Sequence, residues 1–155
     1  MHSEKSRNII CDMMRLVLDT NVLVAASRSR LGASFQLLEA WQDNRFTAVA
    51  SVPLFLEYKA VLKRPEHLRV SGFALPEIDV LLAQWAVWIE PVTLHYLWRP
   101  QLTDAKDELV LETAANGRTD AIVTFNATHF LKAAAAFDLK VWSPADVLKR
   151  LRIMK

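Results

Sequence analysis

Three acidic residues occupy positions where the apolar pattern of the sequence predicts buried side chains. The first is Asp19, which directly follows the apolar run 16–18. If that run is a strand of an open parallel sheet, Asp19 lies at its carboxyl end, where such sheets bind their ligands. Thr20 and Asn21 then turn the chain into a segment with helix-compatible apolar spacing. Asp19 is therefore the first candidate for chemistry.

Glu57 is the second such acid. In a helix, Lys59 and Lys63 would lie on the face opposite to Glu57. A carboxylate on an apolar face must be paired, metal-bound or protonated, because burying its charge alone is costly. The alternative is a glutamate at the rim of that face, reaching solvent or an arginine. The residues one helical turn away from Glu57 are all apolar, namely Pro53, Leu54, Ala60 and Val61.

Asp107 is the third acid, and it heads an apolar stripe of helical spacing that continues through Val110, Leu111 and Ala114. Asp104 precedes it by three residues. The alternative here is purely structural, because Asp104 suits an N-cap and Asp107 suits the first turn of a helix.

Polar residues also follow the apolar run 121–125, which is typical of a parallel strand covered on both faces. Asn126 stands at the carboxyl end of this predicted strand. It is interpreted either as an N-cap amide or as a polar group that faces the same crevice as Asp19. Asp120 stands at the opposite end and is interpreted as a turn residue or cap.

Carboxylates that converge without a counter-ion repel one another and raise one another's pKa values. A hard divalent cation relieves that repulsion, since Mg²⁺ and Mn²⁺ prefer oxygen ligands. Such an ion can lower the pKa of a bound water and hold a phosphate oxygen. The acidic residues therefore indicate metal-assisted phosphodiester hydrolysis.

Strands and helices alternate along the chain, which predicts an α/β fold: a three-layer α/β/α sandwich with a mostly parallel, about five-stranded central sheet. Pro91 favours an edge position or a bulge for its strand, and Asn116-Gly117 predicts a helix C-cap. The expected strands are 15–18, 47–50, 88–92, 121–125 and 139–142. The expected helices are 22–44 with a break near 28–32, 51–64, one from 75, 107–115, 126–135 and one from 143, with a short helix or loop at 66–73 and a loop at 95–103.

Composition narrows the class of protein. A chain of 155 residues with 52% hydrophobic and 23% charged residues is typical of one globular domain. We expect a loosely ordered leader at 1–13 and one domain at 14–155. The apolar runs are too short to cross a membrane, and the single cysteine excludes a disulfide framework within the chain. A cytoplasmic location is the default expectation, and the net charge of +2 permits a nucleic-acid partner without indicating one.

Other α/β enzyme classes fit poorly. A haloacid-dehalogenase-like phosphatase needs a second aspartate where Asn21 stands, and a receiver domain needs paired acids around the first strand. No glycine-rich phosphate-binding loop is present among the three glycines. The histidines have no evident nucleophile beside them and are interpreted as surface or loop residues.

The ordered set of segments resembles the PIN-domain ribonucleases, closest to the VapC-like toxins of bacterial toxin–antitoxin systems. Any one segment is weakly specific, whereas the set occurs in the family's order over residues 14–145. The matching segments are 16–22, with Asp19-Thr20-Asn21; 54–58, with Glu57; 62–65; 104–107, with both aspartates; and 121–131, with Thr124 and Asn126.

The resemblance implies that Asp19, Glu57 and Asp107 are catalytic and ligate Mg²⁺ or Mn²⁺, with Asp104 as a candidate auxiliary ligand. The metal-activated water would cut single-stranded RNA. The residues implied to support the first acid or orient water are Thr20, Asn21, Thr124 and Asn126. The resemblance also implies a homodimer and a small inhibitory antitoxin protein, with no membrane partner.

One departure from the family pattern is Asn126, which stands where the family usually has a fourth acid. We therefore expect one metal site, weaker than in four-acid relatives. The alternative function is a catalytically weak or inactive PIN-fold module that binds RNA or protein. Candidate contacts to RNA phosphates are Arg28, Arg30 and Arg64.

Overall fold

A parallel sheet of five strands forms the centre of the molecule, as the computed structural model shows for residues 13–96 and 102–153. The strand order is β3-β2-β1-β4-β5, and every neighbouring pair is parallel. The predicted α/β sandwich is thus confirmed. The strands are β1 (Arg15–Leu18), β2 (Thr47–Ala50), β3 (Glu90–Pro91), β4 (Ala121–Val123) and β5 (Lys140–Trp142).

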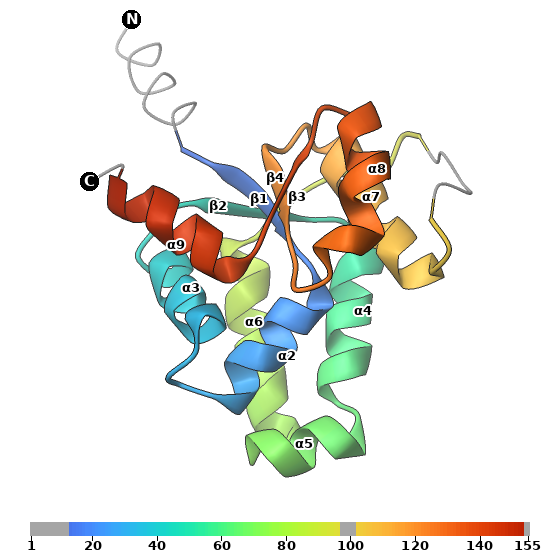
Figure 1. The fold of residues 1–155 in the computed structure, drawn as a ribbon. Coiled ribbons are helices and arrows are strands. Elements are labelled where there is room, and N and C mark those ends of the chain that lie inside the picture. The colour runs from blue at the N-terminus through green and yellow to red at the C-terminus, as the bar shows by residue number, and fades with distance from the viewer. Residues whose placement is uncertain (1–12, 97–101, 154–155) are drawn as a thin grey trace, which may run out of the picture.

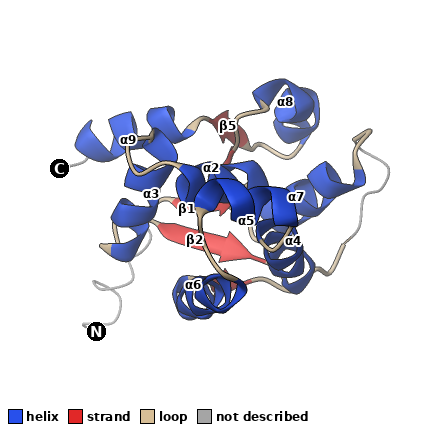
Figure 2. Cartoon of the chain, turned by 90° about the horizontal axis from the view of Figure 1, so that it is seen from below, coloured by secondary structure: helices blue, strands red, loops and turns tan. Residues whose placement is uncertain are grey.

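Helices flank the sheet (Figure 1). In Figures 1 and 2, α3 and α9 lie on one side of the strands, and α7 and α8 on the other. The helices are α2 (Thr20–Arg28), α3 (Ala33–Gln42), α4 (Val52–Leu62), α5 (Pro65–Ser71), α6 (Leu75–Trp88), α7 (Ala105–Asn116), α8 (Ala127–Ala136) and α9 (Pro144–Ile153). Except for Met13, the predicted leader 1–13 lies outside the described residues, as does part of the predicted loop 95–103.

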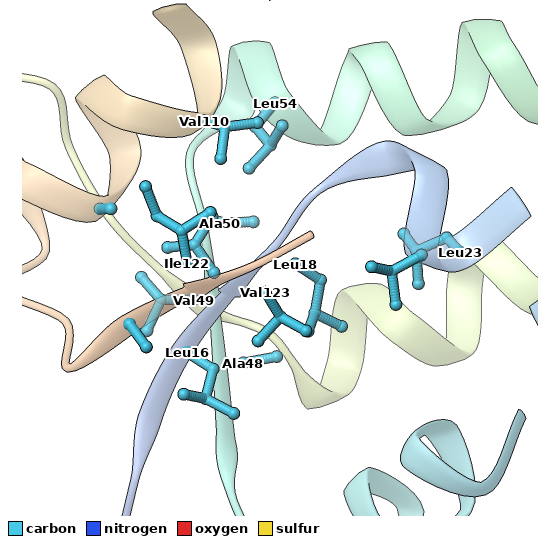
Figure 3. Close-up of a cluster of buried hydrophobic side chains, with 14 of the residues drawn as sticks. Leu16, Leu18, Leu23, Ala48, Val49, Ala50, Leu54, Val110, Ile122 and Val123 are labelled. Carbon is cyan, nitrogen blue, oxygen red and sulfur yellow. The ribbon is translucent and has the colours of Figure 1, made fainter. Parts of the chain in front are cut away.

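Three central strands supply most of the core beneath the site (Figure 3). The apolar side chains of these strands are almost wholly buried, and Leu54 of α4 and Val110 of α7 pack on them. Each such leucine or valine contributes about 1.5–3 kcal/mol to folding. The carboxyl ends of β1 and β4 are therefore held firmly, as is whatever follows them. The strand residues are Leu16, Leu18, Ala48, Val49, Ala50, Ile122 and Val123.

Two predicted strand boundaries are wrong. The predicted strand at 88–92 loses Trp88, because α6 continues through this residue and its indole packs edge-on against Trp41, with ring centroids 5.4 Å apart. The remaining strand, β3, is the predicted edge strand. The predicted strand at 121–125 stops at Val123, and Phe125 is 52% exposed. Thr124 therefore lies just beyond the strand, free to turn its hydroxyl towards the site.

The predicted C-cap of α7 is confirmed, since the helix ends at Asn116 and Gly117 caps it. The φ of Gly117, −81°, lies in the right-handed region, and Arg118 takes the positive φ of 49°. A Cβ at Gly117 would lie only 3.0 Å from the Thr113 carbonyl oxygen and from Val92 Cγ2. Glycine is needed at this position because a side chain would collide with Thr113 and Val92, and not because the backbone makes a left-handed turn.

Among the residues described, none of the helices alone is long and apolar enough to cross a membrane. The pair α5 and α6 passes the same test of length and composition only when joined across an 89° bend.

Candidate functional site

The carboxylate of Asp19 lies at the carboxyl end of β1, as predicted, and occupies the N-cap position of α2. Only 8% of the surface of Asp19 is exposed to solvent. Thr124 Oγ1 donates a 2.7 Å hydrogen bond to Asp19 Oδ2. The backbone amides of Thr20 and Asn21 lie near enough to favour the charged carboxylate, although no side-chain capping hydrogen bond closes. Asp19 is thus a buried anion held by polar groups.

Burial raises the pKa of Asp19 above its ordinary value and is the largest influence on it. The hydrogen bond from Thr124 acts in the opposite direction, and the negative charge of Asp107 raises this pKa further. Asp19 and Asp107 are therefore close enough to repel each other, although they lie on different elements. The charges of these two predicted acids therefore interact in the folded protein.

Asp107 lies in the first turn of α7, where its side chain is 13% exposed. Its Oδ2 is 3.1 Å from Nδ1 of His129, on α8. Burial and then the charge of Asp104 raise the pKa of Asp107, while the contact with His129 lowers it. His129 was interpreted from the sequence as an ordinary surface residue. Its position three residues after Asn126, on the same helix face, was the signal that could have linked it to the site.

Asp104 fits the structural alternative. It is the N-cap of α7, and its Oδ1 accepts a 2.8 Å hydrogen bond from the Lys106 amide. Its charge still acts on Asp107, so it lies at the border of the acidic site. A groove of about 850 Å³ begins there and runs between α7 and α8. Its lining includes Asp104, Asp107 and His129, together with Lys132.

The environment predicted for Glu57 is only partly correct. The residue is half-buried, but two of its four predicted apolar neighbours, Pro53 and Ala60, are exposed. The buried stripe of α4 passes through Leu54, Tyr58, Val61 and Leu62 instead. Within the described part of the chain, Glu57 makes no hydrogen bond or ion pair. The rim position considered as the alternative describes it better.

Tyr58 takes the buried position beside Glu57 and was missed by the sequence reasoning. Its hydroxyl donates a hydrogen bond to the carbonyl oxygen of Leu18, the residue before Asp19. Burial, followed by the charge of Asp19, raises the pKa of Tyr58 well above its ordinary value. The spacing of Leu54, Tyr58 and Val61 could have indicated this position. Tyr58 fastens α4 to the end of β1 at the site.

The hydroxyl of Thr124 also organises the two asparagines. Asn21 Nδ2 lies 3.5 Å from Thr124 Oγ1, and the Asn126 amide donates to the same oxygen over 2.9 Å. The Oδ1 atom of Asn21 is buried without a hydrogen-bond partner among the residues that the structure describes. Asn126 is the N-cap residue of α8, but its exposed side chain makes no capping hydrogen bond. The predicted capping role of that side chain is therefore wrong.

Oxygen atoms are the ligand donors that the side chains of this site offer. Across residues 13–96 and 102–153, no three His, Cys, Asp or Glu side chains are arranged to hold a metal ion. Two carboxylates, Asp19 and Asp107, do interact, and neither has a lysine or arginine ion-pair partner in the described residues. Mg²⁺ commonly uses one or two carboxylates plus waters. The two carboxylates suit one hard divalent cation, and Asn21 Oδ1, which has no partner among the described residues, is a further oxygen of the same donor type.

The predicted phosphate contacts lie away from these acids. Arg28, at the end of α2, donates a 2.6 Å hydrogen bond to His67 Nδ1 on α5. Arg64 is the N-cap residue of α5, and its charge acts on the same histidine. Arg30 lies in the exposed segment after α2, where it makes no hydrogen bond or ion pair with described residues.

Comparisons with known proteins agree on the fold. The family model described as a PIN domain matches residues 15–128. Among solved structures, the chain is similar to one titled as VapBC2 from Rickettsia felis bound to a DNA fragment from their promoter. The TM-score is 0.54 and the identity 17%, covering 84% of this chain and 98% of that one. No curated protein matches the sequence. At 17% sequence identity, this structural similarity shows a shared fold and no more.

Proposed function

Because the chain belongs to the PIN domain family, a family of nucleases, we propose that it is a metal-dependent endoribonuclease that hydrolyses phosphodiester bonds of single-stranded RNA. The observation that carries the proposal is the buried carboxylate of Asp19, which faces the charge of Asp107 without a basic partner among the described residues. Folding has concentrated negative charge that a cation would neutralise.

Asp19 and Asp107 would hold the Mg²⁺ or Mn²⁺ ion, with Glu57 and Asp104 contributing from the rim. When bound, such an ion lowers the pKa of a water ligand and polarises a phosphate oxygen. The protein's own groups fix the site. Thr124 orients the Asp19 carboxylate and Tyr58 holds the end of β1. Because the acids repel a phosphodiester, RNA would approach them closely only after their charge is neutralised.

The proposal extends to a biological role as the toxin of a toxin–antitoxin pair in the cytoplasm. The solved structure similar in fold is named as a VapBC2 assembly, which supports a small antitoxin protein as partner here too. The antitoxin would cover the groove that Asp104 and Asp107 line. The enzyme itself would be a homodimer. Sedimentation of the purified protein tests the dimer. Co-expression with the product of an adjacent short gene tests the antitoxin, which should relieve any growth arrest.

The direct test is cleavage of a fluorogenic single-stranded RNA with Mg²⁺, with Mn²⁺ and with EDTA. We expect cleavage with either metal and none with EDTA. Asp19→Asn and Asp107→Asn should each abolish it. The matched control is Asp43→Asn, an exposed acid at the end of α3, which should cleave like the wild type. Equal residual cleavage in all four proteins would show that another enzyme is the source.

A binding module is the second candidate function, and Asn126 is the observation that favours it. Asn126, where the family pattern has a fourth acid, presents an exposed side-chain amide that makes no hydrogen bond to the described residues. An amide adds no negative charge for a metal. If the wild type binds single-stranded RNA but cleaves it with neither metal, this second function replaces the first.

A further inference from the structure

A cationic cluster lies where α2, α4 and α5 meet. It consists of Arg28 at the end of α2, Arg64 between α4 and α5, and His67 in the first turn of α5. The Arg28 guanidinium and His67 Nδ1 are 2.6 Å apart. Since a guanidinium can only donate, Nδ1 must accept, and the imidazole is neutral with its proton on Nε2. His67 therefore fixes the direction of Arg28.

The positive charge of this cluster is not balanced. Neither Arg28 nor Arg64 forms an ion pair with a described residue. The adjacent Lys63 does, with Asp79 of α6. Burial, followed by the charge of Arg28, lowers the pKa of His67, and Arg64 acts in the same direction. Glu66 opposes them, so two guanidinium groups surround the imidazole against one nearby carboxylate.

Helix α2 connects this cluster to the acidic site, because it begins after Asp19 and ends at Arg28. Figure 1 shows α5 crossing the ends of α2 and α4 that point away from the sheet. Asp19 precedes the first residue of α2 and Arg28 is its last residue, so about 13 Å of helix axis separates them. That distance is too long for Arg28 to contact the phosphate held at Asp19, so any phosphate that Arg28 binds would be another one along the same strand.

We propose that Arg28 and Arg64, oriented by His67, bind a backbone phosphate of the RNA strand beyond the one that is cleaved. Guanidinium groups recognise phosphate through paired hydrogen bonds, and the contact with His67 Nδ1 holds the Arg28 guanidinium in place for them. Arg30, grouped with these arginines from the sequence, is not part of the cluster. The inference rests on the proposed ribonuclease function, because it needs a single strand bound at Asp19.

The test measures binding of a labelled, mixed-sequence single-stranded RNA of about 12 nucleotides by fluorescence anisotropy over a series of salt concentrations. Asp19→Asn serves as the background in which the RNA stays intact. Adding Arg28→Gln and Arg64→Gln should weaken binding and reduce the slope of log K against log[salt] by about 0.7 for each phosphate that the protein no longer neutralises. The matched control is Arg152→Gln on α9, which should leave the slope unchanged.

The outcomes separate the two proposals. If the background protein binds RNA and the double variant keeps its affinity and salt slope, the phosphate site is wrong and the ribonuclease proposal stands. If Arg152→Gln lowers the slope as much as the double variant, the contacts are diffuse and the phosphate site is again wrong. If the background protein binds no RNA at all, the proposed function fails and this inference fails with it. Thermal melting of each variant establishes that it is folded.

Discussion

Thr124 Oγ1 donates a 2.7 Å hydrogen bond to Asp19 Oδ2, although the two residues are 105 positions apart in the chain. The contact follows from the register of the sheet, in which Leu18 pairs with Val123. Each of these strand residues is followed by a polar residue, and parallel pairing places the two polar residues side by side. The central strand pair therefore aligns the acid and its donor.

Thr124→Val should destabilise the metal-free protein by about 1–3 kcal/mol, because it removes a hydrogen-bond donor from a buried carboxylate while keeping the side-chain shape. Thr124→Ser keeps the hydroxyl and is the control. Urea unfolding at neutral pH measures the difference. Equal unfolding free energies for the valine and serine variants would show that the hydrogen bond contributes nothing.

Asp19→Asn should make the metal-free protein more stable at neutral pH. Burial and then Asp107 raise the pKa of Asp19 in the folded protein above 3.8, the value expected when it is unfolded. Between these two values the native state binds more protons than the unfolded state, so wild-type stability falls as pH rises through this window. The advantage of the variant should therefore shrink on acidification and vanish below pH 3.8.

Thermal melting in EDTA across this pH range measures the effect, with Asp43→Asn as the control. The two acids titrate as a coupled pair, so the pH midpoint belongs to both. A wild type that gains stability over Asp19→Asn as pH rises would overturn the electrostatic account of the site.

Local patterns were sufficient to predict the sheet and the acids at its edge. Asp19 follows a buried run, and alternating strands and helices limit the topology, so its place at the carboxyl end follows from sequence alone. Ser51, the start of the predicted helix 51–64, is a second example, because it is the N-cap of α4 and accepts a hydrogen bond from the Leu54 amide.

Contacts between separate helices were beyond prediction. Periodicity identifies the buried face of a helix but not the side chain that meets it, so the pairing of Asp107 with His129 was missed. The same limit applies to α4. A rotation of its buried face by one residue exchanges Glu57 for Tyr58, and apolar spacing alone tolerates either choice because Pro53 and Ala60 can be exposed without cost.

Millimolar Mg²⁺ or Mn²⁺ should raise the melting temperature of the wild type, because the ion binds the folded pair of acids and not the unfolded chain. At a metal concentration of about 100 times Kd, the stabilisation is about 2.7 kcal/mol. EDTA should reverse it, and the double variant Asp19→Asn, Asp107→Asn should not respond. Melting curves that are unchanged by metal and by EDTA would exclude a metal site of useful affinity.

His129→Ala should weaken metal binding about 10–100-fold, because partners that hydrogen-bond a ligating carboxylate fix its orientation. The side chain is 52% exposed, so unfolding free energy without metal should change little. Leu131→Ala, an exposed residue of α8 outside the groove lining, is the control for substitution on this helix. Midpoints of metal titrations followed by melting temperature measure the effect. An unchanged midpoint would place the contact between His129 and Asp107 outside the metal site.

Asn126→Asp should strengthen both metal binding and RNA cleavage by about tenfold, equivalent to about 1.4 kcal/mol. The substitution restores an acid where the family pattern has one, and the exposed side chain gives up no capping hydrogen bond. The backbone amide that donates to Thr124 is retained, so the arrangement around Asp19 should survive. Without metal, the added charge should destabilise the protein slightly by repelling the other acids.

Asn126→Ser is the control, because it keeps a polar residue suited to an N-cap but adds no charge. Metal titrations and the fluorogenic RNA assay then separate two effects. If the aspartate variant binds metal more tightly and cleaves faster, the amide is what limits the natural enzyme. If it binds metal more tightly but cleaves no faster, position 126 acts on metal affinity alone. If neither changes relative to the serine control, Asn126 lies outside the active site.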